Sequence, residues 1–176
     1  MRANILWLLF PFVLLAQSGS VSKQSQSQPV VQATPQAQQP EEVRAVEQSR
    51  AEAEEGVKHM LISQLEAWNH HRLEAFMQGY WRSSNLTFFS GGTVTKGWEP
   101  TLQRYRQRYQ SEGKEMGQLE FQDLNIDIVG RGAAIVTGSW RLTMSDGSQP
   151  HGLFTLIVKK MPGGWRIVHD HTSAAE

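Results

Sequence analysis

The middle of the chain carries apolar residues at helical spacing. A first helix is predicted to begin at Glu41, and its apolar stripe recurs at i, i+4, i+8 and i+11 through Val57, Leu61, Leu65 and Trp68. A short second helix is predicted over residues 73–77, with Gly79 as its stop. A third begins at Glu99-Pro100, because proline is favoured in the first turn.

From residue 118 onward, the apolar period changes from helical spacing to two. This alternation predicts four strands, at residues 118–129, 133–145, 152–161 and 165–173, separated by glycine-containing turns. A shorter hairpin is predicted earlier, at residues 86–90 and 93–98. Helices followed by a meander of strands predict an α+β fold, in which a curved antiparallel sheet packs against amino-terminal helices.

The first long strand contains a slip in its alternation. Leu119 and Phe121 are in one phase, whereas Leu124, Ile126 and Ile128 are in the other. A slip of one residue predicts a bulge or sharp bend near Gln122-Asp123. A sheet bent in this way would fold around the helices as a cone with a pocket at its wide end.

The amino-terminal segment has the layout of a secretory signal, with one arginine, an apolar run over residues 5–15 and small residues after it. The expected organisation is a signal peptide at residues 1–20, a disordered Gln/Ser/Pro-rich linker at 21–40 and one domain at 41–176. The protein is therefore expected to be exported, either periplasmic or secreted, with no membrane attachment after signal cleavage.

Charge and cysteine content narrow the function classes. Acidic and basic residues balance at 17 each, so nothing in the net charge favours nucleic acid or an anionic membrane as a partner. The chain has no cysteine, which excludes disulfides and lipid attachment to a thiol. The expected partners are a small organic ligand and a second copy of the chain.

The last predicted strand carries the candidate chemistry. Strict alternation places His169 and His171 on the face of Trp165 and Ile167, with Asp170 on the opposite face. Two imidazoles that continue an apolar stripe are expected to line a hollow.

Three roles remain open for this pair. The histidines could bind a metal with a third ligand from His70, His71 or His151, although no diagnostic ligand spacing supports a metal. They could perform acid–base catalysis. They could also form a fixed polar lining that recognises a ligand. The sequence predicts no metal and no cofactor.

Aromatic residues with polar ends suit the wall of an amphipathic pocket. The candidate ligand-binding residues share either such an end or a place beside the histidine strand, and they are Tyr80, Trp98, Tyr105, Tyr109, Trp140 and Ser173.

An ordered set of motifs carries a family resemblance over about residues 57–173. These motifs are Gln64-Leu65-Glu66-Ala67-Trp68-Asn69, residues 73–81, residues 86–92, Gly97-Trp98-Glu99, residues 105–109 and residues 164–173. Together they resemble the nuclear transport factor 2-like (cystatin-like) superfamily, and within it the SnoaL-like polyketide cyclases and the calcium/calmodulin-dependent kinase II association domains. The resemblance implies a cone with a cavity and frequent homodimerisation, but no single chemistry.

One position departs from the family pattern. An aspartate usually follows the Trp-Asn pair and caps the second helix, whereas this chain has His70-His71-Arg72. Either the cap is lost or Asn69 replaces it.

The functional expectation is an exported small-molecule-binding or assembly domain. The alternative is a lyase or isomerase of the polyketide cyclase or dehydratase type, which would use the pocket histidines His169 and His171 as acid and base.

Overall fold

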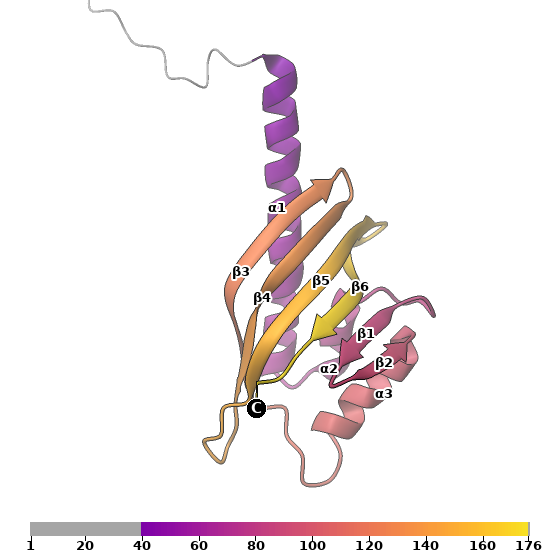
Figure 1. Cartoon of the computed structure of the whole chain (residues 1–176), viewed down its shortest axis with the longest axis vertical. Coiled ribbons are helices and arrows are strands. Elements are labelled where there is room, and N and C mark those ends of the chain that lie inside the picture. Colours follow the sequence, from indigo (N-terminus) through magenta and orange to yellow (C-terminus); the bar gives the residue numbers. More distant parts are fainter. Residues whose placement is uncertain (1–39, 176) are drawn as a thin grey trace, which may run out of the picture. The chain divides into compact units, whose positions relative to one another are not determined.

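The computed structural model describes residues 40–175, which form one unit of helices packed on a single sheet (Figure 1). The expected signal peptide and nearly all of the expected linker lie outside the described residues, so export stays a prediction. Within residues 40–175, no helix has the length and apolarity needed to cross a membrane.

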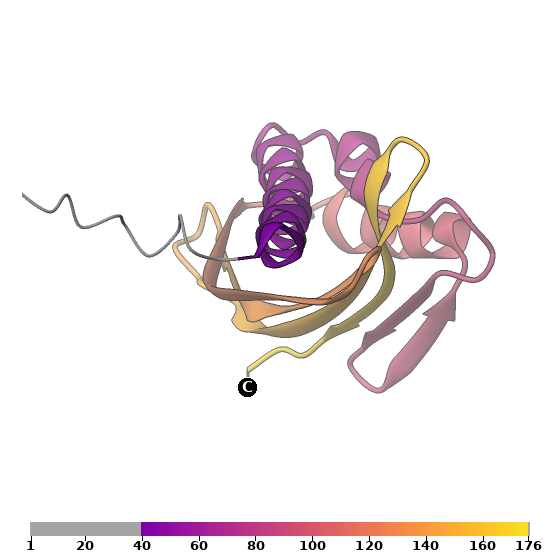
Figure 2. The same cartoon turned by 90° about the horizontal axis from the view of Figure 1, so that it is seen from above.

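The helices follow the predicted order. They are α1 (Glu41–Asn69), α2 (Leu73–Phe76), a 3-10 turn η2 (Met77–Gly79) and α3 (Trp98–Tyr109). The carboxy-terminal half of α1 supplies most of its buried residues, because its apolar stripe begins at Val57. Viewed from above, the helices all lie on one side of the curved sheet (Figure 2).

The sheet has six strands in the order β2-β1-β6-β5-β4-β3. Their bounds are β1 (Thr87–Ser90), β2 (Thr93–Lys96), β3 (Gln118–Gly130), β4 (Ala133–Thr143), β5 (His151–Met161) and β6 (Gly164–Thr172). The four long strands form the predicted antiparallel meander. The short hairpin joins it through a parallel pairing of β1 with β6, which the sequence pattern did not indicate.

The core lies between the concave face of the sheet and the helices. Val57, Leu73, Val136 and Val158 are completely buried there. Gly56 lets α1 approach β6, because a Cβ at this position would lie 2.6 Å from Nε1 of Trp165. Helix α1 continues without interruption through Gly56. A side chain at this position would displace the indole ring of Trp165.

Two bulges shape the sheet, besides a register shift at the end of β3 between Ile128 and Gly130. The predicted slip in β3 is confirmed: the pairing with β4 shifts between Gln122 and Asn125, and Asp123 has a positive φ of 53°. A second bulge, in β6, was not predicted. Ile157 pairs with His169 and Val158 pairs with Ile167, so the intervening residue of β6 has no partner in β5.

Asn69 does not replace the aspartate that usually caps the second helix in the family that the sequence resembles. Its side chain donates to the backbone oxygen of Leu119 at 3.0 Å and accepts from the backbone N–H of Leu119 at 2.7 Å. Helix α2 has Arg72 at its N-cap position and no side-chain cap. The cap is therefore lost, and Asn69 instead ties the end of α1 to β3.

The outer face of the sheet carries exposed apolar side chains, at Ile135, Leu153 and Ile157. The structure holds one copy of the chain, and homodimerisation stays a prediction.

Candidate functional site

A cavity of about 730 Å³ lies between the concave face of the sheet and the helices α1 and α3. This volume is within the usual range for sites that take small organic molecules, about 300–1,000 Å³. Nine aromatic residues line its wall: Trp68, Phe76, Tyr80, Phe88, Tyr105, Tyr109, Phe121, Trp140 and Phe154. Polar side chains gather at only a few points on this wall, so each of them bears on what the cavity can hold.

Five of the six candidate ligand-binding residues line this cavity: Tyr80, Tyr105, Tyr109, Trp140 and Ser173. The sixth, Trp98, lines a separate surface hollow instead. Its indole Nε1 donates to the backbone oxygen of Met77 at 2.9 Å, and the guanidinium of Arg82 lies 4.8 Å from its ring centre. Trp98 thus fastens α3 to the η2 turn, away from the cavity.

The expectation that the two histidines face the hollow is wrong. His169 and His171 lie on the outer side of the sheet, where the ring of Phe89 packs edge-on against both at 4.9 and 5.9 Å. Nδ1 of His169 is 2.7 Å from the hydroxyl of Thr87, and burial followed by the charge of His171 lowers the pKa of His169. The bulge in β6 causes the difference, since one extra residue exchanges the two faces of the strand beyond it.

Asp170 takes the inward position instead and is 3% exposed. Its Oδ2 accepts a hydrogen bond from the Tyr80 hydroxyl at 2.7 Å, and its Oδ1 accepts one from the Thr172 hydroxyl at 2.6 Å. The Tyr80 hydroxyl is also 3.3 Å from that of Tyr105. Asp170 is not recognisable as a site residue from the sequence, because regular alternation would place it on the outer face.

Burial dominates the electrostatics of this cluster. It raises the pKa of Asp170 from 3.8 to about 6, although the hydrogen bonds from Thr172 and Tyr80 and the charge of His171 act in the opposite direction. Burial, reinforced by the charge of Asp170, also raises the pKa of Tyr80 and of Tyr105 well above the ordinary value of 10. The cluster therefore combines two neutral phenols with a carboxyl group whose pKa lies near 6.

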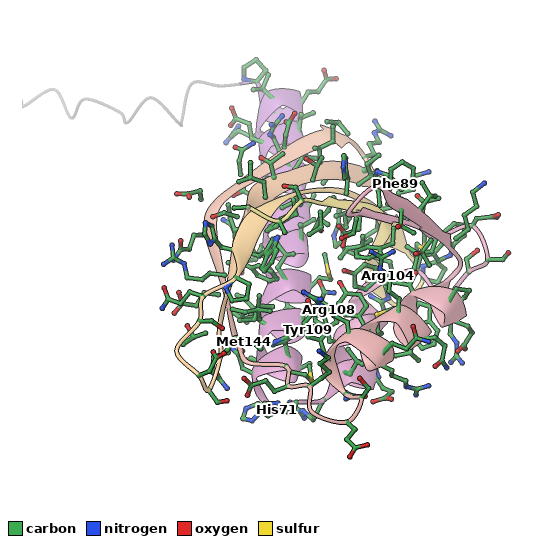
Figure 3. All side chains as sticks on the ribbon, turned by 60° about the horizontal axis from the view of Figure 1, so that its bottom comes forward. His71, Phe89, Arg104, Arg108, Tyr109 and Met144 are labelled. Atoms are coloured by element: carbon green, nitrogen blue, oxygen red, sulfur yellow. The ribbon has the colours of Figure 1, made fainter. Side chains whose placement is uncertain are left out.

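Two arginines of α3 line the same cavity, Arg104 and Arg108. Tyr105 and Tyr109 reach the cavity wall from the same helix. The two tyrosine rings stack at 5.9 Å, and the guanidinium of Arg108 lies 6.0 Å from the Tyr109 ring centre. Figure 3 shows Arg104, Arg108 and Tyr109 close to one another beside α3.

The segment after β6, residues 173–175 (the C-terminal tail), forms part of the wall and runs along the start of β5. The backbone N–H of Ser173 donates to Leu153 and that of Ala175 donates to His151, both at 2.9 Å. The indole N–H of Trp140 donates to the backbone oxygen of Ser173 at 3.0 Å. Trp140 therefore holds the tail against the sheet.

The third ligands considered for a metal lie apart from the histidine strand's outer face. His70 and His71 are at the end of α1, and the exposed His151 begins β5, where its Nδ1 is 3.0 Å from the backbone oxygen of Gln149. Within residues 40–175, no three His, Cys, Asp or Glu side chains are close enough together to hold a metal ion.

A curved six-stranded sheet that encloses a cavity with its amino-terminal helices is the architecture of the nuclear transport factor 2-like, or cystatin-like, fold. The family model for the SnoaL-like domain matches residues 57–176. The chain belongs to the SnoaL-like family. No curated protein matches it.

Solved structures agree with this assignment. An NTF2-like protein of unknown function from Shewanella oneidensis MR-1 is 37% identical, with a TM-score of 0.63 over 68% of this chain and 97% of the other. An NTF2-like superfamily protein from Salmonella enterica serovar Typhimurium is 19% identical, with a TM-score of 0.61 over 72% and 94%. A putative calcium/calmodulin-dependent protein kinase type II association domain from Thiobacillus denitrificans is 17% identical, with a TM-score of 0.58 over 68% and 94%. The last two likenesses concern the fold alone.

Proposed function

We propose that this protein binds a small organic molecule in the cavity between the sheet and the helices. The observation that carries the proposal is the union of an aromatic wall with one buried polar cluster, formed by Asp170, Tyr80, Tyr105 and Thr172. Sites for small molecules are mostly apolar and fix the ligand's orientation with a few well-placed polar groups. Export, expected from the amino-terminal segment, belongs to the same proposal and would place this binding outside the cytoplasm.

A fluorescent probe tests the proposal without knowledge of the natural ligand. N-phenyl-1-naphthylamine is neutral and aromatic, and its emission rises when it leaves water. The wild-type protein is expected to bind it, and Ser90→Trp is expected to weaken binding at least tenfold, because Ser90 lines the cavity and an indole would fill part of it.

The matched control is Val94→Trp, which places the same ring on the exposed partner strand of the same hairpin, on the face opposite to that of Ser90. Equal binding by the two variants, with both folded by circular dichroism, would place the probe elsewhere on the surface and count against the proposal. Absence of binding to the wild-type protein would also oppose it. Native mass spectrometry of protein purified from its own host then identifies the ligand.

A second candidate function, acid–base catalysis, is favoured by the raised pKa of Asp170. The alternative drawn from the sequence used His169 and His171, which lie on the outer face, so the group that can exchange a proton in the cavity is Asp170. Its ionised carboxylate would take a proton from a carbon next to a carbonyl group. The Tyr105 hydroxyl would donate a hydrogen bond to the resulting enolate oxygen. Return of the proton to another atom gives an isomerase, and loss of a leaving group gives a lyase.

Hydrogen–deuterium exchange tests this second candidate. Incubation with acetophenone in D₂O is expected to exchange its methyl protons faster than buffer alone, and NMR follows the loss of signal. Asp170→Asn is expected to abolish the acceleration, and the double variant His169→Ala/His171→Ala is expected to retain it. Exchange that Asp170→Asn leaves intact would remove Asp170 from this role.

A further inference from the structure

Helix α3 carries three arginines, and their pairing divides them into two groups. Arg106 lies away from the cavity and forms an ion pair with Glu74 at 2.7 Å. Arg104 and Arg108 line the cavity, and within residues 40–175 neither has a carboxylate within 4.0 Å. Among the three arginines of α3, positive charge without a protein counter-charge is therefore confined to the two that face the cavity.

Arg104 is held in one orientation. Its Nη2 donates to the backbone oxygen of Ser90 at 3.0 Å, its Nη1 donates to the Thr95 hydroxyl at 3.3 Å, and its guanidinium lies 5.4 Å from the Phe88 ring centre. These partners are neutral, so they position the guanidinium without cancelling its charge. A guanidinium fixed in this way is preorganised to bind an anionic group.

Arg108 lies one helical turn further along α3, on the same side as Arg104. It is more exposed than Arg104, and it lies beside the ring of Tyr109. Both arginines line the cavity from successive turns of α3, so a single anionic group placed between them is positioned to interact with both. Electrostatic attraction at this position is screened by salt more than it would be in a buried site.

Asp170, the other charged group that lines the cavity, disfavours a negatively charged ligand group. Asp170 is buried, and its ionised form is already disfavoured there, so a second negative charge beside it would be repelled. The arginines and Asp170 therefore give the cavity two polar points of opposite preference, one that attracts an anion and one that accepts a hydrogen bond from a neutral donor. A ligand with one acidic end would fit in one orientation only.

We infer that the ligand is an organic acid with an aromatic or otherwise flat apolar body, whose anionic group binds Arg104 and Arg108 and whose far end reaches Tyr80 and Asp170. This inference rests on the proposed ligand-binding function and specifies the chemical class of the ligand. The pairing of Arg104 and Arg108 to a ligand acid would parallel the pairing of Arg106 to Glu74 on the other side of the helix.

If these arginines only stabilised helix α3, their replacement would have a different effect on probe binding. Arg106 and Arg108 both lie in the last turn of α3, where positive charge stabilises the end of a helix. If that were the only role of Arg108, its replacement would lower helix stability and would not distinguish a charged ligand from a neutral one. The same reasoning applies to Arg106, which therefore serves as the matched control.

The test uses two probes that differ only by one anionic group. They are 1-anilinonaphthalene-8-sulfonate and N-phenyl-1-naphthylamine, which has the same ring system without the sulfonate. Fluorescence titrations would compare the wild-type protein with Arg104→Gln, Arg108→Gln, the double variant and Arg106→Gln.

The double variant is expected to lose at least about tenfold in affinity for the sulfonate probe, the size expected when charge-assisted hydrogen bonds are removed. Its affinity for the neutral probe is expected to stay within about twofold, and Arg106→Gln is expected to leave both affinities unchanged. Added NaCl is expected to weaken binding of the sulfonate probe alone.

Equal effects of Arg108→Gln on the two probes would overturn the inference and leave the proposed function standing. Failure of the wild-type protein to bind either probe would overturn both. Arg104→Gln also removes the hydrogen bonds that join α3 to β1 and β2, so Arg108→Gln, which removes none of these bonds, decides the case if the Arg104 variant is unfolded.

Discussion

Asp170 makes the stability of this protein depend on pH in a direction that is unusual for a carboxyl group. Its pKa is about 6 in the folded chain, against an ordinary value of 3.8 that applies when the chain is unfolded. The folded state therefore binds the proton more tightly, and its free energy of unfolding falls as the pH rises between these two values. A pKa difference of about 2.2 corresponds to about 3 kcal/mol in full, of which about 2.4 kcal/mol appears between pH 4 and pH 8.

The perturbation that isolates this effect is Asp170→Asn, because an amide has no proton to lose in this range. Urea unfolding followed by circular dichroism at pH 4 and pH 8 gives the free energy of unfolding of each form. Relative to wild type, the variant is expected to gain about 2–3 kcal/mol of stability on going from pH 4 to pH 8. Subtracting the wild-type values removes the titration of the other groups.

Asp123→Asn is the matched control, since Asp123 is exposed in the same sheet and asparagine tolerates its positive φ. The control variant is expected to follow the wild-type pH dependence. If Asp170→Asn also follows it, then Asp170 ionises in the folded protein as it does in water, and the buried cluster has been described wrongly.

Three further perturbations test separate contacts, each by urea unfolding unless stated. Tyr80→Phe removes the donor 2.7 Å from the Asp170 carboxylate and is expected to cost about 2 kcal/mol at pH 8 and less at pH 4, where Asp170 is protonated; equal losses would contradict this. Asn69→Ala removes both hydrogen bonds to the backbone of Leu119 and is expected to lower the free energy of unfolding by about 2–3 kcal/mol. A loss well below this value would mean that the amide faces solvent and does not tie α1 to β3. Gly152→Ala would place a methyl group on the backbone of the C-terminal tail, and hydrogen exchange is expected to show faster exchange in the tail with the rest of the sheet unchanged.

Periodicity predicted most of the fold because the core-facing residues are strongly apolar. The stripe from Val57 to Trp68 marked the buried part of α1, and the slip between Phe121 and Leu124 marked the bulge in β3. In β3 the apolar residues themselves change phase, so the bulge is visible in the sequence. The parallel pairing of β1 with β6 was not predictable in this way, because alternation says which face a residue occupies and not which strand lies beside it.

The candidate site was predicted less well, and the reason lies in the type of residue. Beyond Val168 the strand offers histidines on one face and Asp170 on the other, and no large apolar residue reports which face is buried. Regular alternation from Trp165 and Ile167 therefore favoured the histidines as the inward-facing residues. The Tyr80 hydroxyl, which makes burial of the Asp170 carboxylate tolerable, is far away in the sequence and becomes its neighbour only through the tertiary fold.

The bulge in β6 also bears on how such a protein can change over time. Val168 is the extra residue of the bulge. The position of this bulge determines whether the carboxylate of Asp170 or the imidazoles of His169 and His171 face the cavity. Moving that irregularity past Asp170, or regularising the strand, would exchange an acid of pKa about 6 for groups that accept a proton and carry positive charge. A single step in strand register is thus enough to change the chemistry of the cavity lining while every helix and strand keeps its place.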